Sequence, residues 1–417
     1  MPAQPVTKEE FACLMAGLGP FGPDDVKSPI ALAVSGGGDS MALAFLARSW
    51  RVHIIALIVD HGLRPESRQE AELTAQRLSQ MGVPFQILTL EQLKSGGLQE
   101  QARNARFSVL ERACFEKGAS ILMLAHHQAD QEETLQMRVE KKSGLEGMLG
   151  MAPRSSHACL TLLRPFLSLR PERLKATLRT AGIAWCEDPS NQNRRFRRVQ
   201  VRQDLTEKER KFLRGEQERA VRHVQEMEAR LPVLMAEKIR EQPEGWTILS
   251  PDVLTESEPE MADFFLGRLI RRIGGCPYLP SPEALSRLRR KGEGSLGGAV
   301  LKKRLVQGKI KDLILYRECR DLSLSVPAIK GRLWDRRWLY AGPEKVDCQI
   351  AALSGKAGEV REERSVPVSV LQTVPALWRE GQLVAVADCV RGLSLDLPRV
   401  SFSWQGGMKM VGAKQFY

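Results

Sequence analysis

The sequence lacks several patterns by which whole classes of protein are recognised. It contains no run of about 18 apolar residues, so we expect no membrane-spanning helix. Its eight cysteines stand singly and form no Cys-x-x-Cys pair, which leaves zinc ribbons, iron–sulfur ligation and redox motifs without support. Met1–Glu10 has no basic-then-apolar leader pattern. Together these features predict a cytoplasmic protein with reduced thiols.

Two common nucleotide-binding signatures are also missing. No Gly-Lys-Ser/Thr follows a glycine loop, which excludes a P-loop, and the Gly-x-Gly-x-x-Gly spacing of dinucleotide-binding folds is absent. Internal repeats and low-complexity tracts are not evident. What is present is a chain of 417 residues, 43% hydrophobic and 27% charged, which is typical of a folded protein with two or three domains.

The most informative stretch is Ile30–Ser40, in which an apolar run leads into Ser35, three glycines, Asp39 and Ser40. It predicts a strand, a tight turn and a helix that Asp39 opens. Glycines let a ligand approach bare N–H groups, and a helix N-terminus attracts anions. We therefore expect a phosphate site made of Ser35, Gly36, Gly37, Gly38 and Ser40. Asp39 suits a Mg²⁺ ion bridged to phosphate oxygens. The plain alternative is a glycine-rich connection with a capping Asp.

Apolar runs alternate with helical patterns through the first part of the chain. Strands are predicted over 30–34, 52–59, 85–90 and 121–125, and helices over 41–48, 66–81 and 98–117. This alternation predicts an α/β fold with a doubly wound parallel sheet. Ligands bind such sheets beyond the carboxyl ends of the strands. Three of these ends carry polar clusters, at 35–40, 60–64 and 126–130.

The third cluster begins with His126 and His127 and continues into an acidic helical pattern. A helix starting near Gln128 would place Asp130, Glu133 and Thr134 on one face. A carboxylate–Mg²⁺ site or a polar substrate site fits better than zinc, for which thiolates and a third ligand helix are lacking. The structural alternative is an acidic helix N-terminus favoured by the helix dipole, which leaves the paired histidines unexplained.

Positive charge is concentrated in two segments. The net charge is +12; residues 194–224 carry eleven Lys or Arg against five acids, and residues 268–304 carry ten against two. Such clusters predict a polyanionic partner larger than a nucleotide, and solvated helix faces are the alternative. The first cluster, with Phe196 among its arginines, suits phosphate contacts and base stacking. Its candidate RNA-binding residues are Arg194, Arg195, Arg197, Arg198 and Arg202.

The composition of the chain shifts after Asp204. A long charged helix is predicted over 208–241, followed by amphipathic helices over 256–273 and 281–290 and a hairpin-like pair over 296–317. From residue 323 onward, short apolar runs alternate with Gly and Pro turns, which predicts a small β-rich domain with either a stabilising or an RNA-binding role.

Six motifs occur in one order: Ser-Gly-Gly-Gly-Asp-Ser, Asp-His-Gly-Leu-Arg, His-His-x-x-Asp-Gln-x-Glu-Thr, Ser-Gly-Leu-x-Gly-Met, Arg-Pro-Phe and Asp-Pro-Ser-Asn-x-Asn. The set is similar to that of the bacterial tRNA(Ile)-lysidine synthases, which belong to the N-type ATP pyrophosphatase (PP-loop) superfamily. The match is dense from Ile30 to about Leu205. The chain departs from the family pattern in two places: Ala129 stands where the family usually has Asp, and Lys141-Lys142 replace its Arg-Gly.

The resemblance implies an ATP-dependent ligase that acts on the wobble cytidine of the isoleucine tRNA with a CAU anticodon. ATP would adenylate the cytosine, and free L-lysine would then displace AMP. ATP and Mg²⁺ are the implied cofactors, with His61 and Arg64 joining the phosphate loop and Asp39 holding the metal. Arg106, or Arg103 one turn before it, would neutralise the α-phosphate. Asp130 and Glu133 would hold the lysine and accept its proton.

The resemblance also suggests a domain organisation. Residues 1–205 would form a PP-loop catalytic domain, 206–322 a helical linker and tRNA-binding domain, and 323–417 a small β-rich C-terminal domain. Whether the protein forms a homodimer stays an open question. Three alternatives remain: a PP-loop tRNA thiolase, which needs active cysteines; a small-molecule amidotransferase, which needs a glutaminase domain; and a non-catalytic RNA-binding protein, which would not need Asp39 and both loop serines.

Overall fold

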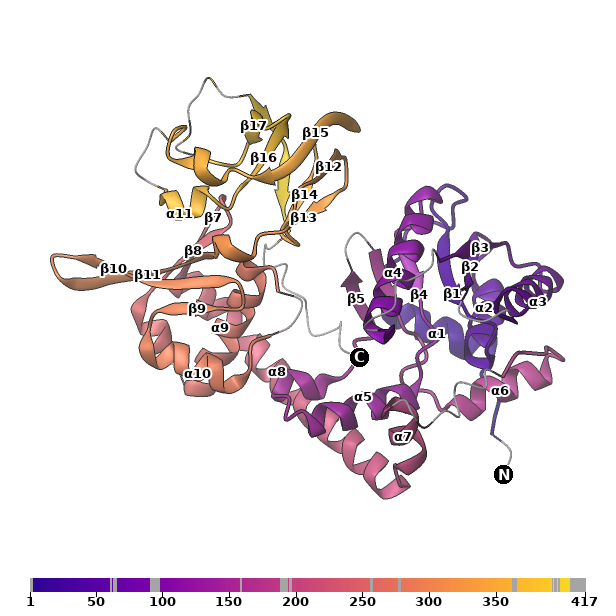
Figure 1. The fold of residues 1–417 in the computed structure, drawn as a ribbon. Coiled ribbons are helices and arrows are strands. Elements are labelled where there is room, and N and C mark those ends of the chain that lie inside the picture. The colour runs from indigo at the N-terminus through magenta and orange to yellow at the C-terminus, as the bar shows by residue number, and fades with distance from the viewer. Residues whose placement is uncertain are drawn as a thin grey trace. The chain divides into compact units, whose positions relative to one another are not determined.

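The computed structural model describes two compact units, one formed by the chain up to Arg222 and a second beginning at His223 (Figure 1). No helix among the described residues is both long and apolar enough to cross a membrane. The described cysteines are all free. The residues described are 3–60, 62, 66–90, 98–157, 160–187, 194, 197–255, 258–276, 279–361, 366–391, 393, 396 and 398–405.

A six-stranded sheet forms the centre of the first unit, with strand order β3-β2-β1-β4-β6-β5. Neighbouring strands are parallel except for β5, an antiparallel edge strand. The predicted doubly wound parallel sheet is therefore confirmed. Because β2 and β4 lie on opposite sides of β1, the chain winds one way from β1 and then the other. The strands are β1 (Ile30–Val34), β2 (Ile54–Asp60), β3 (Phe85–Thr89), β4 (Ile121–Met123), β5 (Arg154–His157) and β6 (Leu160–Leu163).

Most predicted elements lie close to their expected positions. One difference is the start of β2, which was predicted at Val52 and begins at Ile54. The backbone N–H groups of Val52 and His53 donate to the Asp24 carboxylate, at 2.8 and 3.0 Å, rather than to a neighbouring strand. The helices of this unit are α1 (Lys8–Leu18), α2 (Gly38–Trp50), α3 (Glu66–Gln80), α4 (Leu98–Glu116), α5 (Gln128–Glu140), α6 (Pro171–Thr180) and α7 (Arg197–Asp204), with a 3₁₀ turn η1 (Leu145–Leu149).

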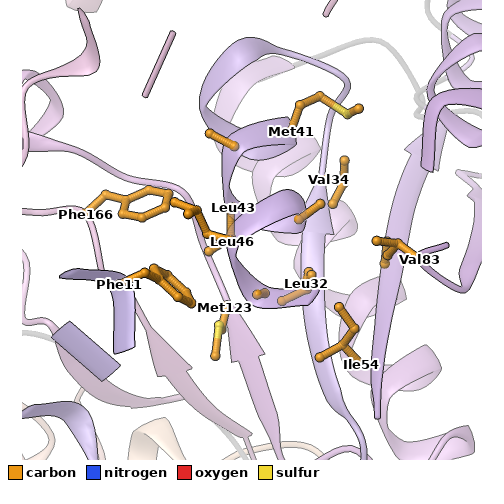
Figure 2. Packing of buried hydrophobic residues seen from close by; sticks show 14 of the residues in the cluster. Phe11, Leu32, Val34, Met41, Leu43, Leu46, Ile54, Val83, Met123 and Phe166 are labelled. Atoms are coloured by element: carbon orange, nitrogen blue, oxygen red, sulfur yellow. The ribbon is translucent and has the colours of Figure 1, made fainter. Parts of the chain in front are cut away.

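Alternate residues of β1 enter two separate hydrophobic cores. Leu32 and Val34 pack toward α1, α2 and α6, against side chains such as Phe11 and Leu43 (Figure 2). Ala31 and Ala33 belong to the core on the other face, which α4 covers. Burial on both faces explains why β1 is a continuous apolar run rather than an alternating one. Because β1 and β4 are paired parallel neighbours in the sheet between these cores, their carboxyl ends lie side by side.

Among the described residues, the second unit combines three helices that lie wholly within it with three small sheets (Figure 1). The sheet orders are β7-β8-β11-β10-β9, β12-β15-β16-β17-β18 and β13-β14-β19. The predicted β-rich end of the chain is thus confirmed. The elements are β7 (Ile239–Gln242), β8 (Trp246–Leu249), α9 (Pro259–Gly274), α10 (Pro282–Lys291), β9 (Gly294–Leu296), β10 (Ala299–Val306), β11 (Lys309–Arg317), β12 (Val326–Ile329), β13 (Leu333–Trp334), β14 (Trp338–Tyr340), β15 (Lys345–Ala352), α11 (Val368–Leu371), β16 (Pro375–Arg379), β17 (Gln382–Ala387), β18 (Arg399–Val400) and β19 (Phe402–Trp404).

Buried contacts join the two segments predicted as separate domains, 206–322 and 323–417. The Asp335 carboxylate accepts hydrogen bonds from Arg317, at 3.0 Å, and from Arg337, at 2.7 Å, and all three side chains are buried. Burial raises the pKa of Asp335, but the two guanidinium groups outweigh this and hold it below its usual value. The helix α8 (Glu207–Lys238) begins in the first unit and ends in the second. The three-domain division itself stays a prediction.

Candidate active site

The phosphate loop connects β1 to α2 with a sharp turn at Gly36, whose φ is +85°. The helix begins at Gly38, one residue before the predicted start at Asp39. Ser40 Oγ donates to the Gly37 carbonyl oxygen, at 2.9 Å, and accepts from the backbone N–H of Ser35, at 3.2 Å. No side chain in the described part of the chain caps α2. The first N–H groups of α2 therefore suit an anion from outside the protein.

Neighbouring segments support this loop from both sides. A Cβ at Gly36 would lie 2.3 Å from Thr74 Oγ1 on α3, and a Cβ at Gly38 would lie 3.4 Å from the ring of Trp185. The Gly36 carbonyl accepts a hydrogen bond from the Cys186 backbone N–H, at 2.9 Å. Glycine at position 36 is thus required by packing and by backbone conformation, independently of any ligand.

Asp39, on the first turn of α2, has two carboxylate oxygens in different surroundings. Its Oδ2 lies 3.5 Å from Nε2 of His127. Its Oδ1 is buried and, within the described residues, has no hydrogen-bond partner. A buried carboxylate oxygen without a donor, beside a phosphate loop, fits the ligand preference of Mg²⁺. The residues present therefore fit the predicted metal.

His127 joins the two strand ends. It is the N-cap residue of α5, and its Nδ1 accepts from the Asp130 backbone N–H, at 3.3 Å, while Asp130 Oδ2 accepts from the His127 N–H, at 3.0 Å. With Nδ1 as an acceptor, the hydrogen of the neutral ring lies on Nε2, which faces Asp39. Burial lowers the pKa of His127, but Asp39 and Asp130 outweigh this and raise it above its usual value.

The predicted lysine-binding acids and two predicted RNA-binding arginines contact one another. Glu133 is fully buried and accepts from Arg198 Nε, at 2.9 Å, and from Arg202 Nε, at 2.5 Å. Asp130 Oδ1 accepts from Arg202 Nη2, at 3.3 Å. Burial raises the pKa of Asp130, but His127 and Arg198 outweigh it and hold this pKa below its usual value. Residues predicted to bind lysine and residues predicted to bind RNA thus form one cluster.

The remaining predicted site residues are placed as follows. Arg194 pairs with Asp204, with two contacts of 3.0 Å, and Arg197 pairs with Glu140 on α5. Arg106 is half-buried on α4. His61, Arg64 and Arg195 lie outside the described residues, as do Phe196 and the side chain of Arg103. Within the described ranges, no three His, Cys, Asp or Glu side chains gather as metal ligands.

Sequence reasoning gave no role to three residues that organise this site. His127 was seen only as one of two histidines, although the His-x-x-Asp spacing after a strand is a capping pattern. Glu132 is buried and accepts from Arg210 Nη1, at 2.8 Å, and from Arg214. The Gln131 side chain binds both the N–H and the carbonyl of Met151, at 2.7 and 2.8 Å. The arginine excess after α5 was the available signal for the Glu132 pair.

Much of the chain is similar in sequence to known proteins. A family model described as a PP-loop domain matches residues 12–209. A tRNA(Ile)-lysidine synthase of Ruegeria pomeroyi is 34% identical over 388 residues, which cover 88% of this chain and 91% of that protein. A tRNA(Ile)-lysidine synthase of Hyphomonas neptunium is 32% identical over a match that covers 83% of this chain and 95% of that protein. A third, of a Bradyrhizobium species, is 45% identical over 189 residues, which cover 44% of this chain and 53% of that protein.

Two glutamates on α5 provide a test of how this cluster is held. Glu132→Gln should lower the free energy of unfolding by about 3–5 kcal/mol, because it leaves Arg210 and Arg214 facing a buried site without a charge. Glu140→Gln also removes a glutamate–arginine pair, but an exposed one, and should change stability far less. Urea unfolding of both variants measures this. Equal losses would mean that burial of Glu132 adds nothing.

Proposed function

The chain belongs to the tRNA(Ile)-lysidine synthase family, and we propose that it converts the wobble cytidine of the CAU-anticodon isoleucine tRNA to lysidine in the cytoplasm. ATP and free L-lysine are the other substrates. The observation that carries this proposal is the approach of Asp39 to His127, which brings the phosphate loop to the start of the acidic helix α5. Adenylation and lysine attack require those two features in one site.

The phosphate loop binds the triphosphate of ATP. The uncapped N–H groups at the start of α2 and the hydroxyls of Ser35 and Ser40 point to an anion site. Asp39 would hold Mg²⁺, which supplies neutralisation of charge on the phosphate oxygens. His127 fixes one oxygen of Asp39 and leaves the other for the metal. Arg106, with His61 and Arg64, is expected to complete the ATP site.

The first step joins the cytosine to the α-phosphate. The cytosine O2 attacks the α-phosphorus, a new O–P bond forms, and the bond to the bridging oxygen of the β-phosphate breaks. Pyrophosphate leaves with that electron pair. Donors already in place at the loop stabilise the charge that develops on the leaving group. The cytosine must leave its stack to reach this position.

The second step uses Asp130. The lysine ε-ammonium first gives up a proton to water, which frees an electron pair on its nitrogen. This nitrogen attacks C2 of the adenylated base, the C–N bond forms, and the bond from C2 to the adenylate oxygen breaks. AMP leaves with that electron pair, and the nitrogen releases a second proton to water. Because the pKa of Asp130 is below its usual value, this carboxylate is ionised and attracts the cationic amine. The same low pKa makes it a weak base, so we assign Asp130 chiefly to holding the lysine.

Glu133 takes a different role from Asp130 in this proposal. Glu133 is fully buried and both of its oxygens accept from arginine Nε atoms, so it positions Arg198 and Arg202 beside Asp130 rather than binding lysine itself. Arginines approach Asp130 at Oδ1 only, from 3.3 Å or more, and this side chain keeps some exposure. Arg194 and Arg197 stay candidates for tRNA contact, since their pairs are exposed and easily exchanged for phosphates. A thiolase function is not favoured, because the chain has no Cys-x-x-Cys pair.

Asp39→Asn tests the phosphate site. The rate of pyrophosphate release with ATP, lysine and tRNA should fall on the order of 100-fold, because the metal loses a charged ligand. The affinity for tRNA should not change, since Asp39 is not part of a basic surface. Asp25→Asn, an exposed acid of the same unit, is the control and should behave like wild type. Unimpaired turnover of Asp39→Asn would refute the phosphate-loop assignment.

Asp130→Asn separates the two steps. The amide keeps an oxygen for the His127 N–H but loses the charge that attracts lysine. The KM for lysine should rise roughly 10–100-fold, as expected for losing a hydrogen bond to a charged group. With limiting lysine, AMP-labelled tRNA should accumulate from α-labelled ATP. Glu140→Gln on the same helix is the control. Equal loss of labelling and of lysidine would place Asp130 in the ATP site instead.

A further inference from the structure

The β10–β11 hairpin of the second unit extends away from the elements packed around it (Figure 1). The two strands pair from Ala299↔Arg317 to Val306↔Lys309, with a bulge near Leu305. Gln307 and Gly308 close the hairpin with φ values of +50° and +76°, as in the tight two-residue turns that match strand twist. Every residue from Leu305 to Lys311 is exposed.

The tip of this hairpin carries apolar side chains that nothing covers. Leu305, Val306 and Ile310 are 58%, 50% and 46% exposed. Leu305 and Ile310 are directly paired and so share one face of the ribbon. Val306, the next residue along the strand, lies on the other face and pairs with Lys309. Two large aliphatic residues exposed side by side on one face, rather than singly, indicate a binding surface.

The charge on the hairpin identifies the kind of partner. Between Lys302 and Asp312 it carries Lys302, Lys303, Arg304, Lys309 and Lys311, against the single acid Asp312. Asp312 is buried and already pairs with Arg304. Among the described residues, Lys302, Lys309 and Lys311 have no ion pair. This excess favours a polyanion over a protein surface of mixed charge.

Three arginines of the basic segment 268–304 are less available. Arg268 pairs with Glu228, Arg272 with Glu241, and Arg289 with Asp263, at distances of 2.5 to 2.7 Å. These arginines are largely buried and serve the packing of α9 and α10. Three of the ten cations of this segment are thus used internally, while Arg271, Arg287, Arg290 and Lys291 on α9 and α10 are exposed. The hairpin therefore shares the exposed positive charge of this segment with these two helices, and adds an apolar tip to it.

We propose that the β10–β11 hairpin docks on a double-helical arm of the tRNA, with Lys302, Lys309 and Lys311 on phosphates and the aliphatic tip on the ribose surface of the minor groove. This rests on the proposed function, which supplies tRNA as the substrate. An A-form helix presents a wide, shallow minor groove with 2′-hydroxyls, whereas its major groove is too narrow for a ribbon. The amide of Gln307, at the turn, can both donate to and accept from a 2′-hydroxyl.

Two triple variants test the proposal with the full chain and full-length isoleucine tRNA carrying the CAU anticodon. Replacing Lys302, Lys309 and Lys311 by Gln should weaken binding about tenfold or more at 0.1 M salt. Plotted as the logarithm of the binding constant against the logarithm of salt concentration, the slope should also become less steep by roughly 2 to 3, at about 0.7–0.9 per lost phosphate contact. Replacing Leu305, Val306 and Ile310 by Ser should weaken binding with the salt slope unchanged. KM values for ATP and lysine should stay at wild-type levels in both.

The control removes the same charge elsewhere in the second unit. Lys330, Lys345 and Lys356 are exposed, and their triple replacement by Gln should change neither affinity nor slope much. If the serine variant fails to fold, Val306→Ser alone replaces it. Wild-type tRNA affinity in both hairpin variants would overturn the proposal and point to a protein partner. So would an equal loss in the control, which would mean that only net charge matters.

The outcome is separable from the proposed function. Wild-type enzyme that forms no lysidine from ATP, lysine and tRNA refutes the function, whatever the hairpin does. Wild-type enzyme that forms lysidine, while both hairpin variants bind tRNA normally, refutes only the hairpin assignment.

Discussion

The contact between Asp39 and His127 is the constraint on which the proposed chemistry depends. It exists because β1 and β4 are neighbours at the point where the winding of the sheet reverses, so the segments that follow them meet. His127 caps α5 through Nδ1 and faces Asp39 through Nε2, so one ring fixes a helix start and a carboxylate together. The proposed ATP and lysine sites are therefore not independent features. Moving either α2 or α5 would disturb both.

A second set of interactions holds α5 in its place. Three successive side chains, Gln131, Glu132 and Glu133, fasten it to the segment after η1, to α8 and to α7. Buried ion pairs of this kind contribute little net stability, but breaking one leaves a charge uncompensated. The cluster thus defines where α5 can lie rather than how stable the unit is. That suits a helix whose first turn carries Asp130.

The sequence predicted local features well and long-range pairs poorly. The apolar run before three glycines was enough to place β1, the turn and the start of α2 to within one residue, because strand, turn and helix signals are all local. The arginine cluster was different. Arg198 and Arg202 were taken for RNA contacts, yet they lie against acids more than sixty residues away in the chain. A run of basic residues does not show which of its members pair with acids elsewhere in the chain. Arg268, Arg272 and Arg289 are further examples, since each pairs with an acid that the sequence did not indicate.

The most direct test of the account is the adenylation rate of His127→Asn. Asparagine is a good N-cap residue and preserves the start of α5, but its short amide cannot reach Asp39. We predict near-normal thermal stability together with a clear fall in the single-turnover rate of AMP transfer from labelled ATP to tRNA, partly restored by high Mg²⁺. Transfer at the wild-type rate, with the same Mg²⁺ dependence, would contradict the claim that this histidine joins the phosphate loop to the lysine site.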